Sequence, residues 1–146
     1  MTRIFQDTEG EITEILNKSI EQIICLDGVD RNNSFTNIFS IWLKVEQEKC
    51  WYRIFLDAGG CFGEIYNSTK YKEVYSEDID DDEDCPIYQI ESLFSLQELT
   101  IVSALVYPYN VFSGVELKIV FDNGDYLILQ EAKEPDSENN LSVIKV

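Results

Sequence analysis

The fold class is decided by the stretch VELKIVF-DNGD-YLILQ, residues 115–130. In this stretch two runs of alternating apolar residues flank an Asn-Gly pair, Asn123 and Gly124. Such a pair is the strongest short-range signal of a β-hairpin, because both turn residues tolerate a positive φ. The stretch therefore predicts two antiparallel strands, 115–121 and 126–130.

A second hairpin is predicted in the first half of the chain, with strands in 38–46 and 50–56. Its strands align with those of 115–130 at one constant offset of 74 residues. We interpret the two halves as a duplicated strand-and-hairpin unit; the alternative is that any two amphipathic hairpins align this well. Further short strands are predicted at 62–66, 99–107 and 141–146.

A short helix is predicted near the N-terminus. Thr8 with Glu11 three residues later has the form of a capping box, and apolar residues at helical spacing follow, so we expect a helix at 8–18. Residues 19–26 fit either a continuation of this helix or a strand, because β-branched residues dominate there. Residues 27–37, which contain Gly28 and the run Asn32-Asn33-Ser34, are predicted to form a loop.

These segments predict one domain over residues 1–146. The fold class is α+β and mainly β, with antiparallel sheet structure built from two similar strand-hairpin units, as a sandwich or a half-barrel, and the short N-terminal helix. An acidic loop at about 76–86 separates the two β-rich halves.

The charge of the chain limits its function. It carries 28 acidic against 11 basic side chains, has no histidine, and has a formal net charge of -17. A field of this sign attracts cationic partners and repels nucleic acid and anionic membranes. Without histidine no Ser-His-Asp or Cys-His set is possible, and so we predict no catalytic residue, no metal site and no cofactor. An enzyme that works through carboxylates alone is the least favoured alternative.

The compartment is predicted to be the cytoplasm. The first residues show no basic region followed by an apolar stretch, so no signal peptide is expected. The four cysteines lack paired spacing and are predicted to be reduced, with one disulfide as the alternative.

The candidate partner-binding site lies in the acidic loop. Seven carboxylates fall within nine residues, a density that predicts an exposed segment, and tyrosines flank it. Tyrosine is favoured in the cores of interfaces, while surrounding charge steers the encounter with a partner. The alternatives are a solvated acidic loop and tyrosines half-buried in a sheet. The predicted contact residues are Tyr71, Tyr75, Glu77, Asp78, Asp80, Asp81, Asp82, Glu83, Asp84 and Tyr88.

In its size, its acidity and the hairpin segment at 114–127, the chain resembles the small acidic immunity proteins of bacterial toxin-immunity systems, including contact-dependent growth inhibition. The resemblance implies that the protein binds and neutralises a cognate toxin domain, often a basic nuclease, by occluding its surface. The alternative is an acidic nucleic-acid mimic that inhibits a DNA-binding enzyme, which would spread carboxylates at the phosphate spacing of DNA.

Overall fold

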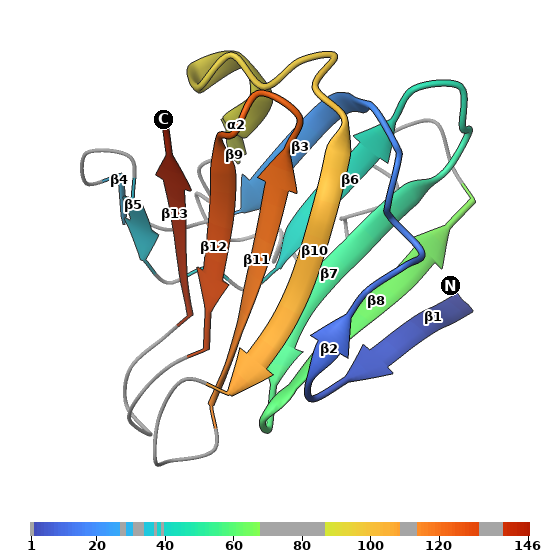
Figure 1. The fold of residues 1–146 in the computed structure, drawn as a ribbon, viewed down its shortest axis with the longest axis vertical. Coiled ribbons are helices and arrows are strands. Elements are labelled where there is room, and N and C mark those ends of the chain that lie inside the picture. The colour runs from blue at the N-terminus through green and yellow to red at the C-terminus, as the bar shows by residue number, and fades with distance from the viewer. Residues whose placement is uncertain are drawn as a thin grey trace, which may run out of the picture.

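The computed structural model describes residues 2–26, 29–30, 34–36, 38, 40–67, 87–108, 114–131 and 139–146. Within them the chain forms two antiparallel sheets (Figure 1). The first has six strands, in the order β1 (Thr2–Asp7), β8 (Gly60–Tyr66), β7 (Trp51–Asp57), β6 (Ile41–Val45), β3 (Ile20–Leu26) and β9 (Ile87–Gln89).

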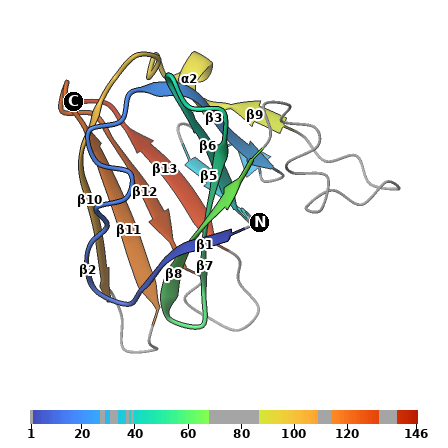
Figure 2. The ribbon, with the colours of Figure 1, turned by 90° about the vertical axis from the view of Figure 1, so that its right-hand side faces the viewer.

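The second sheet has seven strands, and the two sheets lie face to face as the layers of a sandwich (Figure 2). Their order is β2 (Gly10–Glu11), β10 (Ile101–Pro108), β11 (Val115–Phe121), β12 (Tyr126–Gln130), β13 (Asn140–Ile144), β5 (Ser34–Thr36) and β4 (Val29–Asp30). The prediction of a mainly β, antiparallel fold is confirmed, and between sandwich and half-barrel the structure adopts the sandwich.

Both predicted hairpins are present. Strands β11 and β12 pair with Val120 opposite Tyr126, and β6 and β7 pair with Trp42 opposite Arg53. Strands β3, β6, β7 and β8 are neighbours in the first sheet, and β10, β11, β12 and β13 are neighbours in the second. The two hairpins that align in sequence therefore occupy the same place in two four-strand arrangements, one in each sheet.

The core lies between the two sheets. Period-two alternation turns every second side chain of each strand inward, where the residues of both sheets form one apolar cluster. Ile23 and Leu43 of the first sheet border the same small gap as Ile119 and Leu127 of the second. This packing fixes the ends of β3 and β6, from which part of the candidate site projects.

The predicted helix at 8–18 is wrong. The segment instead follows the edge of β10: the Ile12 N–H donates to the Ala104 carbonyl at 2.8 Å, and the Asn17 N–H donates to the Ile101 carbonyl at 2.8 Å. Ile12 and Ile15 are fully buried in the core that the two sheets share. The apolar spacing was real, but these residues close the edge of the sandwich, and tertiary packing overrides local helix propensity.

Residues 20–26 are the strand β3, which resolves the alternative that the sequence left open. The loop predicted at 27–37 contains two short strands, β4 and β5, which extend the second sheet. Phe35 anchors this extension: its ring is buried and meets the ring of Phe94 edge-on, with 6.1 Å between the centroids. One buried aromatic residue thus gives strand geometry to a segment whose composition favours turns.

The helix among the described residues is the single turn α2 (Ile90–Leu93), which follows β9 directly. Among the described residues, no helix is long and apolar enough to cross a bilayer.

Candidate functional site

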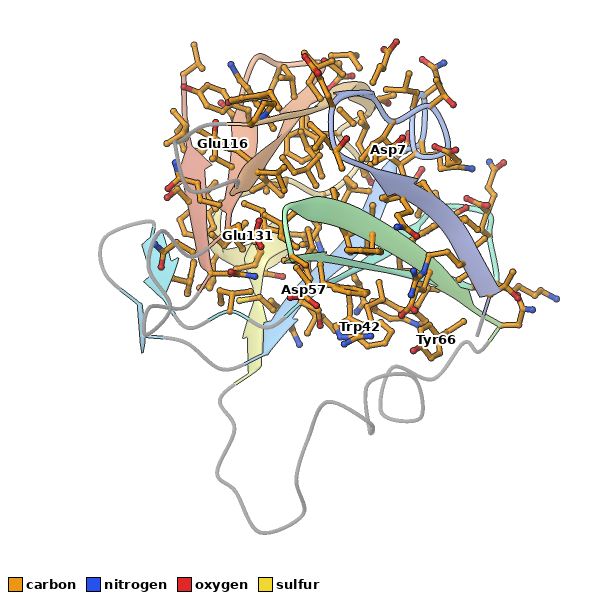
Figure 3. All side chains as sticks on the ribbon, turned by 90° about the horizontal axis from the view of Figure 1, so that it is seen from below. Asp7, Trp42, Asp57, Tyr66, Glu116 and Glu131 are labelled. Carbon is orange, nitrogen blue, oxygen red and sulfur yellow. The ribbon has the colours of Figure 1, made fainter. Side chains whose placement is uncertain are left out.

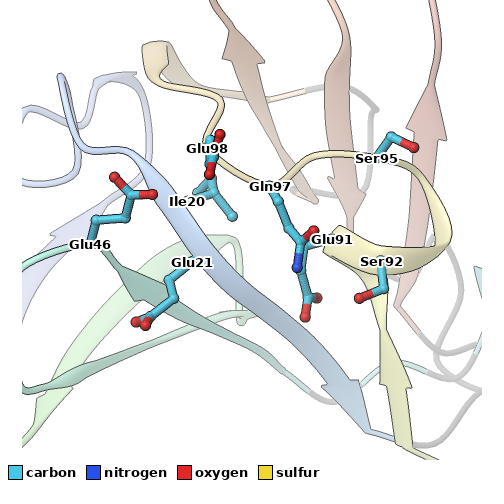
Figure 4. Close-up of a pocket in the computed structure, with 8 residues that line it drawn as sticks. All are labelled: Ile20, Glu21, Glu46, Glu91, Ser92, Ser95, Gln97 and Glu98. Carbon is cyan, nitrogen blue, oxygen red and sulfur yellow. The ribbon is translucent and has the colours of Figure 1, made fainter.

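An open hollow of about 490 Å³ lies beside α2, at the end of the sandwich drawn uppermost in Figure 1. Its lining is strongly acidic and contains no basic residue (Figure 4). The residues that line it are Ile20, Glu21, Glu46, Glu91, Ser92, Ser95, Gln97 and Glu98. Its acidic lining has the same sign of charge as the chain as a whole, and we therefore take it as the candidate site.

Three separate parts of the fold build the hollow. Strand β3 supplies Ile20 and Glu21, and Glu46 follows the end of β6, where its N–H donates to the Ser19 carbonyl at 2.9 Å. The third part is α2 with residues 94–99, which is tied to β3 by the Glu98 N–H donating to the Ile20 carbonyl at 2.9 Å.

The third wall of the hollow is held in an uncommon backbone conformation. Ser95 and Glu98 have φ values of 56° and 67°, in the left-handed region that non-glycine residues rarely adopt. Leu96 lies between them and is fully buried, and its N–H donates to the Glu91 carbonyl at 2.9 Å. Burial of Leu96 offsets the local strain, and strain of this kind concentrates at functional sites.

Glu91 is the buried carboxylate of the hollow. Its side chain is 2% exposed, and its Oε2 accepts the backbone N–H of Ile23 at 3.0 Å. Burial raises the pKa of Glu91, because a desolvated carboxylate is less stable than a neutral acid, and the backbone amides of Ile23, Glu91 and Ser92 oppose part of this shift.

The carboxylates of the hollow have little cationic compensation. Lys44 forms an ion pair with Glu21 and also donates to the Glu48 carbonyl at 3.0 Å. Among the described residues, no basic side chain forms an ion pair with Glu46, Glu91 or Glu98. Three carboxylates therefore converge on one hollow without a counter-ion from the described part of the chain.

Other buried acids serve the fold instead. Glu64 is 3% exposed and lies between two arginines, with Arg53 Nη1 at 3.0 Å from Oε1 and Arg3 Nη2 at 3.3 Å from Oε2. These residues lie on the outer face of the first sheet, where Trp42 and Tyr66 also meet edge-on with 5.0 Å between ring centroids (Figure 3). Here the acid is neutralised by two cations that stack on aromatic rings.

Glu131 and Asp125 also bind within the chain. The Glu131 carboxylate accepts the N–H groups of Gly59 and Val115, each at 3.1 Å, and so ties the β7–β8 turn to the start of β11. Asp125 forms an ion pair with Lys145, and its Oδ1 accepts the Val146 N–H at 2.9 Å. Both acids contribute to the net charge while their carboxylates are bonded within the chain.

Of the contact residues predicted from the sequence, the structure describes only Tyr88. Tyr71, Tyr75, Glu77, Asp78, Asp80, Asp81, Asp82, Glu83 and Asp84 lie outside the described residues. Tyr88 lies in β9, paired with Cys25 of β3, and β9 runs directly into α2. Tyr88 therefore lies three residues before Glu91 along the chain.

The residues that line the hollow were not predicted from the sequence. They come from three separate parts of the fold, and none of those parts contains an acidic run. The one local signal was the isolated Glu91 next to Ile90, in a stretch with apolar residues on both sides.

No protein-family model, no curated protein and no solved structure matches this chain. Cys25, Cys50 and Cys61 form no disulfide within the described residues, and Cys85 lies outside them. Over the described ranges, His, Cys, Asp and Glu side chains form no group that could hold a metal ion. The carboxylates that line the hollow can accept hydrogen bonds and form ion pairs with cationic groups.

Proposed function

We propose that the chain is a cytosolic immunity protein, which binds a basic bacterial toxin domain and neutralises it by occluding its surface. The observation that carries the proposal is the hollow beside α2, which is lined by Glu46, Glu91 and Glu98. No basic side chain among the described residues forms an ion pair with these three acids. A basic protein would supply the missing positive charge. The net charge of -17 would raise the rate at which the two proteins meet.

The distribution of the acids favours a protein partner over the alternative of a nucleic-acid mimic. A mimic must display carboxylates in a row along its surface at the phosphate spacing of DNA. Instead, Glu64, Glu116 and Asp125 are buried and bonded within the chain. The hollow gathers its carboxylates around a concave site, an arrangement that suits a side chain projecting from a protein.

The test is capture of the partner followed by neutralisation. The full chain carrying an affinity tag is expressed in its native host, purified at low salt, and the retained proteins are identified by mass spectrometry. We expect one basic protein that is released by raised salt, because screening weakens association between oppositely charged surfaces. Expression of that protein alone in a laboratory bacterium should stop growth, and co-expression of this chain should restore it.

Each negative result is informative. Retention of no basic protein at low salt would overturn the proposal of a basic partner. Retention of a basic protein whose expression does not harm cells would overturn the immunity function and leave an acidic binding protein. Competition with duplex DNA for several unrelated DNA-binding proteins would favour the nucleic-acid mimic.

A further inference from the structure

We propose that the outer face of the second sheet binds a second copy of this chain, so that the protein self-associates into a two-fold symmetric dimer. The inference goes beyond the proposed function, because it concerns another face of the molecule and another partner. This face is turned towards the viewer in Figure 1, and in Figure 2 no strand or helix of the described residues covers it. Two apolar side chains of β10, Val102 and Leu105, are 49% and 43% exposed.

The centre of the face is made by outward side chains of β11 and β12. The residues between them, such as Leu117 and Leu129, belong to the core, so the alternation of the strands turns these side chains away from it. They form three cross-strand pairs: Val120 with Tyr126, Lys118 with Ile128, and Glu116 with Gln130. Leu105 extends the middle pair onto β10, where it lies opposite Lys118. Contiguous apolar surface of this kind marks an interaction site on a soluble protein.

The charge of the face favours a second copy over a basic protein. The three cross-strand pairs contain one acid and one base, whereas the chain carries 28 acidic and 11 basic side chains. The acid is bonded within the chain, since Gln130 Nε2 donates to Glu116 Oε1 at 2.6 Å, and the Lys118 ammonium lies 4.3 Å from the centroid of the Tyr126 ring. Two copies that each carry a charge of -17 repel one another, so they meet with least repulsion through a face where the charges balance.

The face is also complementary to itself. A two-fold axis parallel to the strands, between β11 and β12, lays each cross-strand pair on the same pair of the other copy. Val120 of one copy then meets Tyr126 of the other, Lys118 meets Ile128, and Glu116 meets Gln130. Apolar side chains thus cover apolar ones, and no two like charges lie in direct opposition. The strands of the two copies are aligned, which is one of the two common ways in which sheets pack face to face.

The size of the face sets the strength of the dimer. Strands β10, β11, β12 and β13 are neighbours in the sheet. Their outer face measures roughly 20 Å by 20 Å, because neighbouring strands lie about 4.8 Å apart and each residue adds about 3.4 Å. Protruding side chains enlarge this footprint, so that the two copies together bury roughly 1,000 Å², the lower limit for a specific interface. We therefore expect a dissociation constant on the order of 10–100 µM.

The first experiment measures the mass of the full chain in solution by sedimentation equilibrium, over a range of protein concentrations and at two salt concentrations. Raising the salt from about 10 mM to about 150 mM shortens the screening length from about 30 Å to about 8 Å. We expect this change to tighten self-association by about tenfold or more, because it weakens the repulsion between the two acidic copies. The same change should release the basic partner. A chain that stays monomeric up to about 1 mM, or a dimer that salt weakens, would overturn the inference.

The second experiment compares matched variants in the same assay. Leu105→Glu and Leu93→Glu each place an acid at an exposed leucine, 43% and 56% exposed, but only Leu105 lies on the face, whereas Leu93 belongs to α2. The new carboxylate at 105 lies opposite Lys118, so Tm should stay near that of the wild type. We expect Leu105→Glu to weaken the dimer at least about tenfold, and Leu93→Glu about threefold or less. Val120→Glu, at the centre of the face, should weaken it at least as much as Leu105→Glu.

Equal effects of Leu105→Glu and Leu93→Glu would overturn the inference, because the contact would then lie elsewhere. A monomeric chain in which Leu105→Glu weakens capture of the basic partner would also overturn it and would assign the face to that partner. Neither result removes the basic partner, so failure of the dimer is distinct from failure of the proposed function.

Discussion

The Asp125→Asn variant tests how the acids that bind within the chain support the fold. Asp125 is 3% exposed and occupies the β11–β12 turn, where Lys145 and the Val146 N–H bind its carboxylate. The bond with Lys145 is the main reason that the pKa of Asp125 falls from 3.8 to about 2. The asparagine side chain keeps the shape and can still accept the Val146 N–H, but it loses the ion pair.

The magnitude follows from the pKa. A shift from 3.8 to about 2 corresponds to about 2.4 kcal/mol at 1.36 kcal/mol for each pKa unit. Because the Lys145 side chain is 39% exposed, solvent screening reduces the expected contribution to about 1–2 kcal/mol. For a chain of this size, that is a fall in Tm of roughly 3–6 °C at pH 7.

The pH dependence has a defined sign. The folded state depresses the pKa of Asp125, so its stabilising effect is complete above about pH 4 and is lost as the pH falls towards 2. Calorimetry of wild type and Asp125→Asn should therefore show a difference in Tm at pH 7 that shrinks towards pH 2. Asp57→Asn, at an exposed position of β7, removes the same charge and serves as the control. An Asp125→Asn effect no larger than the control, or one that is unchanged at pH 2, would refute the reasoning.

Two further predictions address packing and a buried phenol. A Cβ on Gly63 would lie 2.1 Å from Cε1 of Phe5, so Gly63→Ala should cost about 2 kcal/mol in urea unfolding. In a Phe5→Ala background the same change should cost little, and an equal cost there would contradict the steric explanation. Burial and Glu116 raise the pKa of Tyr107 to about 12. Alkaline titration by ultraviolet absorbance should show this pKa fall in Glu116→Gln; no change would rule out a role for Glu116.

The hairpins could be predicted from the sequence because their information is local. Asn123 and Gly124 specify the turn, and alternation along β11 and β12 specifies which face of each strand is buried. The same reasoning located β6 and β7. Such predictions succeed where turn chemistry and apolar period agree.

The segment at 8–18 could not be predicted in this way. Ile12, Ile15 and Leu16 fit a helical face, yet Ile12 and Ile15 are buried because the chain crosses the edge of the sandwich there. What decides the conformation is the free edge of β10, which accepts backbone bonds from this segment. That edge is produced by residues about ninety positions further along the chain.

The candidate site could not be predicted from the sequence for a related reason. The run of acids at 77–84 can be recognised from the sequence alone, because its residues are consecutive and no knowledge of the fold is needed. Glu46, Glu91 and Glu98 are single acids in separate segments, and only the pairing of β3 with β6 and β9 brings them together. The net charge predicts a basic partner, whereas the location of the hollow follows only from the topology.

The most direct test of the account compares two triple variants for affinity to the captured basic partner. Glu46→Gln/Glu91→Gln/Glu98→Gln removes the three carboxylates of the hollow that pair with no basic side chain among the described residues. Glu9→Gln/Glu11→Gln/Asp57→Asn removes three exposed charges at the opposite end of the sandwich in Figure 1. We expect the first variant to lose about 30-fold or more in affinity, mainly through faster dissociation, and the second about threefold or less, through slower association. Equal losses in the two variants would contradict the account, because the net charge alone would then explain binding.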